Sequence, residues 1–226
     1  MKARKPNFLF LAAIIVIGVG LIFLVSAVNA TPINCVFEGN VGYSFDNTGT
    51  IDFNVVKSYS GSLTYESSTP EDAVSSADPH AGWYTGAITQ FTVALGTASF
   101  SLSPSGLNFI NIGNSQPPDF GSDSIAFKAN LVGPGAIGTI FAELLLADQT
   151  RSVFTSDALP VALNLSDFNS PVRLVLGQSD TDFFVNGTPL TKFEGPAGPG
   201  AVPEPATLLL LGAGLVGIYG LRRKMK

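Results

Sequence analysis

Two long apolar segments, one near each end of the chain, confine any globular fold to the residues between them. Residues 8–25 are apolar or glycine throughout, and residues 206–221 are nearly so. The 170 residues of 31–200 that remain are enough for one domain with its own hydrophobic core. We therefore expect one folded domain flanked by two segments of a different kind.

The first segment has the composition of an export signal. Basic residues precede the apolar run, and the small residues Val28 and Ala30 stand at the −3 and −1 positions of a cleavage site. This pattern predicts a helical signal peptide over residues 1–30, export through the translocon and cleavage after Ala30. The run of 18 apolar residues nearly matches the thickness of a bilayer, so an uncleaved anchor is the alternative.

The C-terminal segment consists of a proline-rich motif, an apolar run and a basic tail. The motif is Val202, Pro203, Glu204 and Pro205, which stays extended because proline disfavours helix at and before its own position. Residues 206–221 predict a transmembrane helix, and the basic residues after it predict a stop-transfer signal that stays cytoplasmic. The stop-transfer residues are Arg222, Arg223 and Lys224. With both basic ends in the cytoplasm, we expect the domain between them on the outer side of the membrane.

This arrangement resembles the PEP-CTERM family of sorting signals, in its Val-Pro-Glu-Pro-Ala-Thr motif, its Leu- and Gly-rich helix and its closing Arg-Arg-Lys. The resemblance implies a Gram-negative bacterium and an exosortase-like processing enzyme as partner. It also implies an anchored intermediate in the inner membrane, followed by the cell surface or an extracellular matrix with exopolysaccharide, as in a biofilm. An ordinary C-terminal anchor after a proline-rich linker is the alternative.

The charges of the chain differ by region. Residues 31–200 contain five Lys and Arg residues and 16 Asp and Glu residues, a net charge of −11. An acidic domain repels phosphate backbones, which argues against a nucleic-acid partner.

The single cysteine, Cys35, cannot form a disulfide within the chain, so burial of apolar groups must stabilise the fold.

Short runs of β-forming residues between Gly, Asn and Pro turns predict an all-β domain. Ile51, Phe53 and Val55 would share one face of a strand, and Asn186-Gly187 is a two-residue hairpin signal. The predicted strands are 35–45, 51–59, 62–66, 87–95, 98–102, 108–112, 124–131, 138–146, 172–176, 182–185 and 189–193.

Many short strands of this kind predict a single β-sandwich, jelly-roll-like in its arrangement. The expected organisation is therefore a signal-peptide helix (1–30), a β-sandwich ectodomain (31–193), a Gly/Pro linker (194–201) and the sorting signal with its transmembrane helix (202–226).

The titratable residues argue against an enzyme. A nucleophilic triad needs a base beside a Ser or Cys, and the only histidine, His80, has neither a serine elbow nor a cysteine near it in the sequence. A zinc site would need more His and Cys ligands than this chain has. We therefore expect no catalytic residue and no cofactor.

Calcium needs only oxygen ligands, and two pairs of aspartates are candidates. They are Asp119 with Asp123 and Asp180 with Asp182. Neither pair completes a recognisable calcium loop. Turn chemistry, in which an Asp side chain binds its own backbone, is the competing interpretation.

Trp83 and Tyr84, beside Asp78 and His80, form the best candidate for contact with a sugar ring. The competing interpretation is a strand in which one of the two rings enters the core.

The predicted function is a non-enzymatic surface or matrix protein associated with exopolysaccharide or biofilm. The alternatives are a carbohydrate-binding module and, second, a secreted glycan hydrolase, which would need two carboxylates facing across a cleft.

Overall fold

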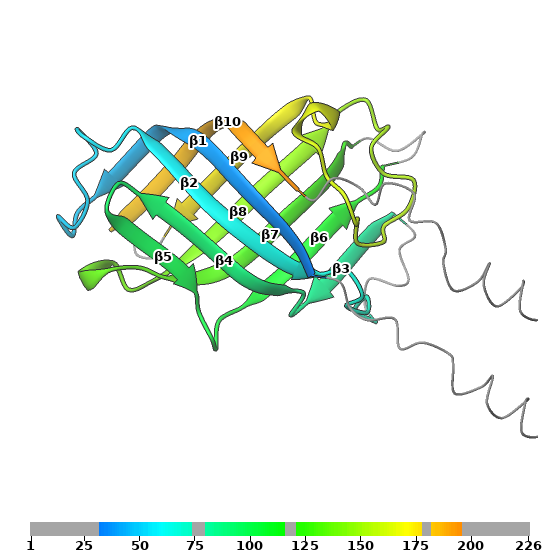
Figure 1. The fold of residues 1–226 in the computed structure, drawn as a ribbon, viewed down its shortest axis with the longest axis horizontal. Coiled ribbons are helices and arrows are strands. Elements are labelled where there is room, and N and C mark those ends of the chain that lie inside the picture. The colour runs from blue at the N-terminus through cyan, green and yellow to red at the C-terminus, as the bar shows by residue number, and fades with distance from the viewer. Residues whose placement is uncertain (1–31, 74–79, 116–120, 178–181, 196–226) are drawn as a thin grey trace, which may run out of the picture. The chain divides into compact units, whose positions relative to one another are not determined.

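A computed structural model describes residues 32–73, 80–115, 121–177 and 182–195. These residues form strands and two short 3-10 turns (Figure 1). In chain order they are β1 (Pro32–Asp46), β2 (Ser58–Glu66), β3 (Ala81–Thr85), β4 (Ile88–Leu95), β5 (Ala98–Leu102), β6 (Asn108–Gly113), β7 (Asp123–Val132), η1 (Gly135–Ile137), β8 (Thr139–Asp148), η2 (Leu165–Asp167), β9 (Ser170–Gly177) and β10 (Phe183–Glu194).

The strands form one antiparallel sheet that closes on itself. β7 pairs with β8 along one edge and with β6 and then β5 along the other. From β5 the sheet continues through β4, β2, β1, β10 and β9 back to β8, so eight strands make a closed barrel, and β6 and β3 extend it at β7 (Figure 1). The predicted jelly-roll-like β-sandwich is wrong, because a sandwich has two separate sheets and these hydrogen bonds run round in one ring.

Side-chain alternation fills this barrel with apolar residues. On β1, for example, Ile33, Cys35 and Phe37 are buried and the residues between them are exposed. Rings from different walls meet inside, with ring centroids 5.5 Å apart for Tyr65 and Phe127. An eight-stranded barrel is narrow enough for side chains to fill, and here large side chains such as Phe37, Phe91 and Phe100 are fully buried inside, so the interior is a packed core.

One end of the barrel is closed by the loop over residues 47–57. Its Ile51 is buried, and the ring of Phe53 lies 6.2 Å from that of Phe183 in the core. The predicted strand over 51–59 is therefore wrong in its first part. The alternating apolar residues Ile51 and Phe53 plug the barrel end instead of lining a strand.

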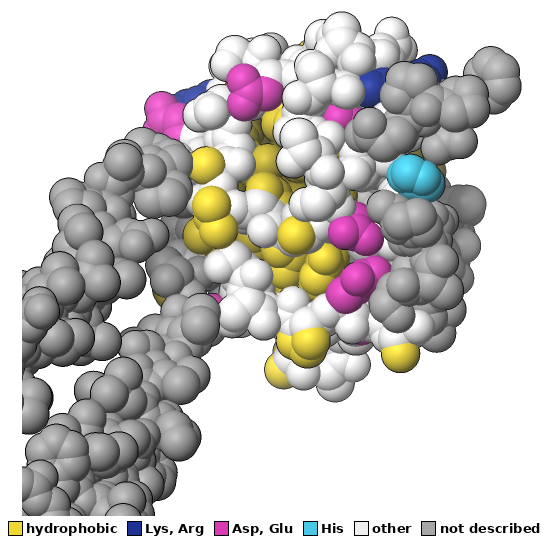
Figure 2. Space-filling model, turned by 90° about the vertical axis from the view of Figure 1, so that its right-hand side faces the viewer, with side chains coloured by type: hydrophobic (Ala, Val, Ile, Leu, Met, Phe, Trp, Pro, Cys, Tyr) yellow, Lys and Arg dark blue, Asp and Glu magenta, His cyan; other side chains and the backbone are white. Residues whose placement is uncertain are grey.

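The other end is closed by the longer loop over residues 149–169. Four of its apolar side chains are buried, and two tyrosines of the sheet hold its backbone. The hydroxyl of Tyr65 donates to the carbonyl of Pro160 at 2.6 Å, and that of Tyr84 donates to the carbonyl of Asp157 at 2.8 Å. Figure 2 views the molecule from this side, with apolar side chains in the middle of the face and acidic ones around them. The buried loop residues are Phe154, Leu159, Leu163 and Phe168.

The predicted hairpin at Asn186-Gly187 is wrong, since β10 runs through both residues without a turn. Gly187 is required there by packing. A Cβ atom on Gly187 would lie 2.6 Å from Cε1 of Tyr59, and one on Gly39 would lie 2.4 Å from Cζ of the same ring. The ring of Tyr59 thus covers two glycines on neighbouring strands, an arrangement known to support glycine in sheets.

Several predicted strands lie within a residue or two of the observed ones, and β5 has the predicted bounds, 98–102. β3, the short strand that contains Trp83, was not among the predicted strands, but it confirms the competing interpretation of Trp83 and Tyr84 as a strand with one ring in the core. It pairs only with β6 and contains two small residues, Ala81 and Gly82, so its local pattern is weak.

The first and last strands of the barrel, β1 and β10, are neighbours. Val36 faces Glu194 near the point where the chain enters and leaves the fold. Between β10 and β9 the pairing is short and covers only Phe184 to Asn186 on β10. Pro189, three residues further along β10, has no N–H to donate to a ladder.

The predicted signal-peptide helix and transmembrane helix lie outside the described residues. Within the part of the chain that the structure describes, no helix is long and apolar enough to cross a membrane.

Candidate functional sites on the barrel surface

The two residues predicted to contact a glycan point in opposite directions from β3. Trp83 is 42% exposed on the outer wall, whereas Tyr84 is 4% exposed and lies in the core. Burial raises the pKa of Tyr84 to about 12, and its hydroxyl is engaged by the loop at Asp157. Of this pair, only Trp83 presents a ring to solvent.

Trp83 belongs to a row of side chains that crosses the outer wall. Its ring stacks on Phe109 of β6 at a centroid distance of 5.2 Å and an interplanar angle of 17°. The ammonium group of Lys128 lies 5.8 Å from the Phe109 centroid and 3.4 Å from the carboxylate of Glu143. We call these four residues the aromatic strip. A flat pair of rings beside charged groups suits the apolar face of a sugar ring, with hydrogen-bonding partners at its edge.

Each predicted calcium pair has one member outside the described residues, so the structure does not test either pair. Asp119 and Asp180 lie outside the described residues, and Asp182 is exposed at the start of β10. Asp123 is fully buried and accepts hydrogen bonds from the backbone N–H groups of Ser115, Val153 and Phe154, at 3.0, 3.0 and 2.9 Å. Its oxygens thus bind protein backbone. Among the described residues no group of three or more His, Cys, Asp or Glu side chains could hold a metal ion.

Sequence reasoning missed Asp148, which faces Asp123 across β7 and β8 and is also fully buried. Its carboxylate accepts hydrogen bonds from the backbone and hydroxyl groups of Thr150 and Ser152, at 2.7 to 3.2 Å. Burial would raise the pKa of Asp148, but these hydrogen bonds lower it to about 2. Both buried aspartates therefore hold the start of the loop over 149–169.

Asp46 does the same at the opposite end of the barrel. It accepts hydrogen bonds from the N–H and hydroxyl of Thr48, at 2.8 and 2.6 Å, and from the N–H of Ile51 at 2.7 Å. Burial opposes ionisation, but these bonds keep the pKa of Asp46 below its usual value. The shared pattern Asp-x-Thr-x-Thr/Ser, at 46–50 and 148–152, is the sequence signal that would have found both loops.

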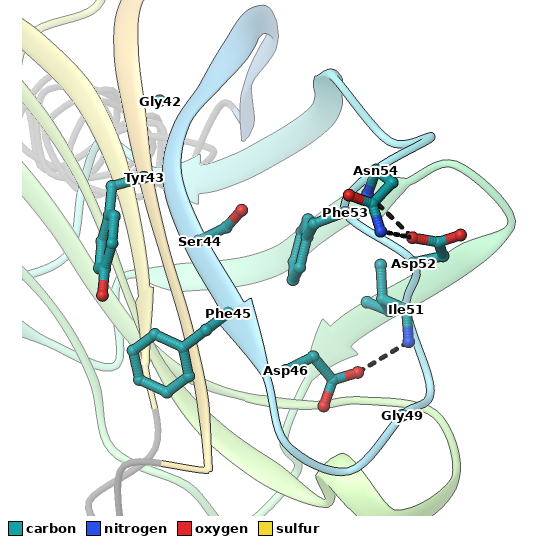
Figure 3. Close-up of a pocket in the computed structure, with 10 residues that line it drawn as sticks. All are labelled: Gly42, Tyr43, Ser44, Phe45, Asp46, Gly49, Ile51, Asp52, Phe53 and Asn54. Atoms are coloured by element: carbon teal, nitrogen blue, oxygen red, sulfur yellow. Dashed lines mark hydrogen bonds between the residues drawn. The ribbon is translucent and has the colours of Figure 1, made fainter.

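A surface hollow of about 590 Å³ lies between the end of β1 and the loop over 49–54. Figure 3 shows Ser44 and Phe53 facing each other across it, while Tyr43 and Phe45 project from the opposite side of β1. The acidic groups here are engaged locally: Asp46 by Ile51, and Asp52 by the side-chain amide of Asn54 at 2.9 Å.

Cys35 is buried on the inner face of β1, and burial raises the pKa of its thiol to about 12. The thiol is therefore protonated at neutral pH and a poor nucleophile.

His80 lies directly before β3, and its backbone carbonyl accepts a hydrogen bond from the N–H of Asn114 at 2.8 Å.

The residues predicted for sorting and cleavage lie outside the described residues. They are Val28, Ala30, Val202, Pro203, Glu204, Pro205, Arg222, Arg223 and Lys224.

Comparison with known proteins places the chain by its C-terminal segment. The family model described as the PEP-CTERM protein-sorting motif matches residues 201–224, which confirms the resemblance predicted from the sequence. No curated protein and no solved structure matches the chain. The motif implies export, targeting to the cell surface and an exosortase as processing partner. The protein therefore carries a PEP-CTERM protein-sorting motif, and residues 201–224 are its sorting signal.

Proposed function

We infer that this protein is a non-enzymatic component of the cell surface or extracellular matrix, associated there with exopolysaccharide. In this proposal the chain is anchored in the inner membrane until an exosortase cuts it near the Pro-Glu-Pro motif. The single observation that carries the proposal is the sorting motif over residues 201–224, a few residues after the end of β10.

The barrel supports a role in contacts and not in catalysis. Its interior is packed with side chains, so any partner must bind the outer wall or the loops. Three of the described groups that could react are engaged or protonated: the carboxylates of Asp123 and Asp148 accept hydrogen bonds from the backbone, and Cys35 is a buried thiol.

Mass spectrometry of both termini tests the sorting part of the proposal, with protein recovered from its native cells and their matrix. We expect a chain that begins at Thr31 and ends between Pro203 and Pro205. Glu204→Ala should leave the C-terminal segment attached, whereas the control Thr64→Ala, in the barrel wall, should be processed normally. A mature population that retains residues 206–226 would contradict release by an exosortase.

The aromatic strip favours a second candidate function, a carbohydrate-binding module. The stacked rings of Trp83 and Phe109 are the observation behind it. Trp83→Ala should weaken retention on the exopolysaccharide of the producing cells about tenfold, about 1.4 kcal/mol, measured by affinity electrophoresis. The matched control is Val36→Ala on β1, at a side chain that is 42% exposed like Trp83 and lies outside the aromatic strip. Equal retention by both variants and the wild type would rule this candidate out.

A further inference from the structure

Side chains on the outer wall form a row across six neighbouring strands, from β6 to β1. Each lies opposite the next in the strand register, and each is half-buried or exposed, so the row faces away from the packed core. Its members are Phe109, Lys128, Glu143, Val175, Asn186 and Tyr43. We call it the outer row. Its first three members belong to the aromatic strip, which therefore continues around the barrel.

More rings stand beside the outer row, one step along the strands. Phe141 lies two residues before Glu143 on β8 and is 38% exposed. On β10 the ring of Phe184 stacks on Phe45 at a centroid distance of 6.0 Å and an angle of 24°, and it lies 6.1 Å from Tyr43. Aromatic rings therefore lie at both ends of the outer row and beside its middle.

The length and the curvature of the outer row restrict its partner. Neighbouring strands lie about 4.8 Å apart, so the five steps from Phe109 to Tyr43 cover about 24 Å along the sheet. From β7 to β1 the row follows four of the eight steps around the closed barrel. A membrane or a rigid globular partner would meet only part of this convex wall, whereas a flexible chain can follow it.

The polar groups of this wall suit a partner rich in hydroxyl groups. Two buried polar atoms beside Val175 have no hydrogen-bond partner among the described residues: the donor Nε of Arg173 and the acceptor Oδ1 of Asn186. Both side chains are half-buried, so rotation would bring these atoms to the surface. A hydroxyl group donates and accepts hydrogen bonds, so the hydroxyls of a sugar can satisfy both atoms.

Charge and strand pairing argue against two other kinds of chain. The domain has a net charge of −11 and repels an acidic polymer, and Lys128 and Glu143 already pair with each other at 3.4 Å. An extended peptide would need an open strand edge to join, but β6, β7 and β8 are paired on both sides. These observations favour an uncharged glycan chain.

We propose that the outer row binds one extended chain of an uncharged polysaccharide, several sugar units long. The exposed rings contact the apolar faces of successive sugars, and the polar side chains between them bind the hydroxyl groups. This inference rests on the carbohydrate-binding candidate above and extends it. The aromatic strip alone suits one sugar ring, whereas the outer row requires a polymer.

Affinity electrophoresis tests the outer row, with protein recovered from the producing cells and freed of polysaccharide. The probes are the neutral and acidic fractions of the exopolysaccharide of these cells, separated by anion exchange, and one- and two-unit fragments of the neutral fraction as competitors. The variants are Trp83→Ala, Tyr43→Ala and Phe141→Ala. Val36→Ala, at an exposed side chain outside the row, is the control.

We expect Tyr43→Ala and Phe141→Ala each to weaken retention on the intact neutral chain about fivefold, with competition by the short fragments unchanged. Trp83→Ala should weaken both, and Val36→Ala should match the wild type. Retention on the intact chain that is unchanged in both Tyr43→Ala and Phe141→Ala would overturn the outer row while leaving the aromatic strip in place. If Trp83→Ala also has no effect, the carbohydrate-binding candidate itself fails.

Three further outcomes would overturn this inference by assigning the row to another partner. The first is retention on the acidic fraction alone. The second is a dimer that Tyr43→Ala abolishes, without retention on glycan. The third is binding to vesicles of zwitterionic lipid that depends on Tyr43 in the same way.

Discussion

Two aspartates facing each other across β7 and β8, Asp123 and Asp148, are among the most buried polar residues described. A buried carboxylate is costly unless hydrogen bonds compensate it, and here the compensation comes from the backbone of the adjoining loops. The carboxylates thus fix the chain where it leaves the sheet, and the loop over 149–169 can pack its apolar side chains into the barrel end.

The lowered pKa of Asp148 makes stability depend on pH. The folded pKa of about 2 lies below the ordinary aspartate value of 3.8, so the stabilising contribution is complete above about pH 4 and is lost as pH falls through about 2. Asp148→Asn should lower the unfolding free energy at pH 7 by about 1–3 kcal/mol, because the amide leaves buried donors unpaired.

Denaturant unfolding of the mature protein at pH 7, 4 and 2 measures this effect. The difference between wild type and Asp148→Asn should shrink toward pH 2. Glu38→Gln, at a side chain 54% exposed, is the control and should differ little from wild type at any of these pH values. A difference that stays constant down to pH 2 would show that ionisation of Asp148 does not matter.

At the scale of elements, β1, β2 and β10 are joined by a ring laid over glycines. Tyr59 occupies the space where Gly39 and Gly187 lack side chains, and its hydroxyl donates to the carbonyl of Thr188 at 3.3 Å. This packing allows β10 to continue where its Asn-Gly sequence alone predicts a turn.

Gly187→Ala should therefore destabilise the barrel by about 1–3 kcal/mol, since the new methyl group meets the Tyr59 ring. Gly177→Ala is the matched control in β9, where a Cβ would make an ordinary contact at 3.4 Å, and we expect little change. The double variant Tyr59→Ala/Gly187→Ala should lose less than the sum of its parts, measured by denaturant unfolding. Additive losses would mean that the ring and the glycine do not interact.

Local patterns predicted individual strands better than their connections. The strand over 98–102 was predicted with its observed bounds, because its flanking turns are visible in the sequence. Ile51 and Phe53 show the limit of such prediction. Their alternation is compatible both with a strand and with a loop that closes the end of a barrel. Trp83 and Tyr84 alternate as in any strand, but which ring faces the core depends on the pairing of β3 with β6.

At the scale of the whole molecule, the sequence could not distinguish a sandwich from a barrel. Both architectures bury every second side chain, and they differ in whether β7 and β8 close the ring, a contact set by pairing and not by composition. The row of Phe45, Phe184 and Phe141 on the outer wall was equally invisible, since the strand register alone brings these residues into line. The sorting signal was predictable because it is a linear motif.

The pairing of the first strand with the last determines how the barrel bears mechanical load. β1 begins where β10 ends, so a pull applied through both chain ends would strain the hydrogen bonds between these strands one after another, like a zipper. A pull applied through one end and the outer wall instead strains many bonds at once. The barrel would therefore open under a pull on both ends of the domain, whereas the ring could resist a pull on one end and the outer wall.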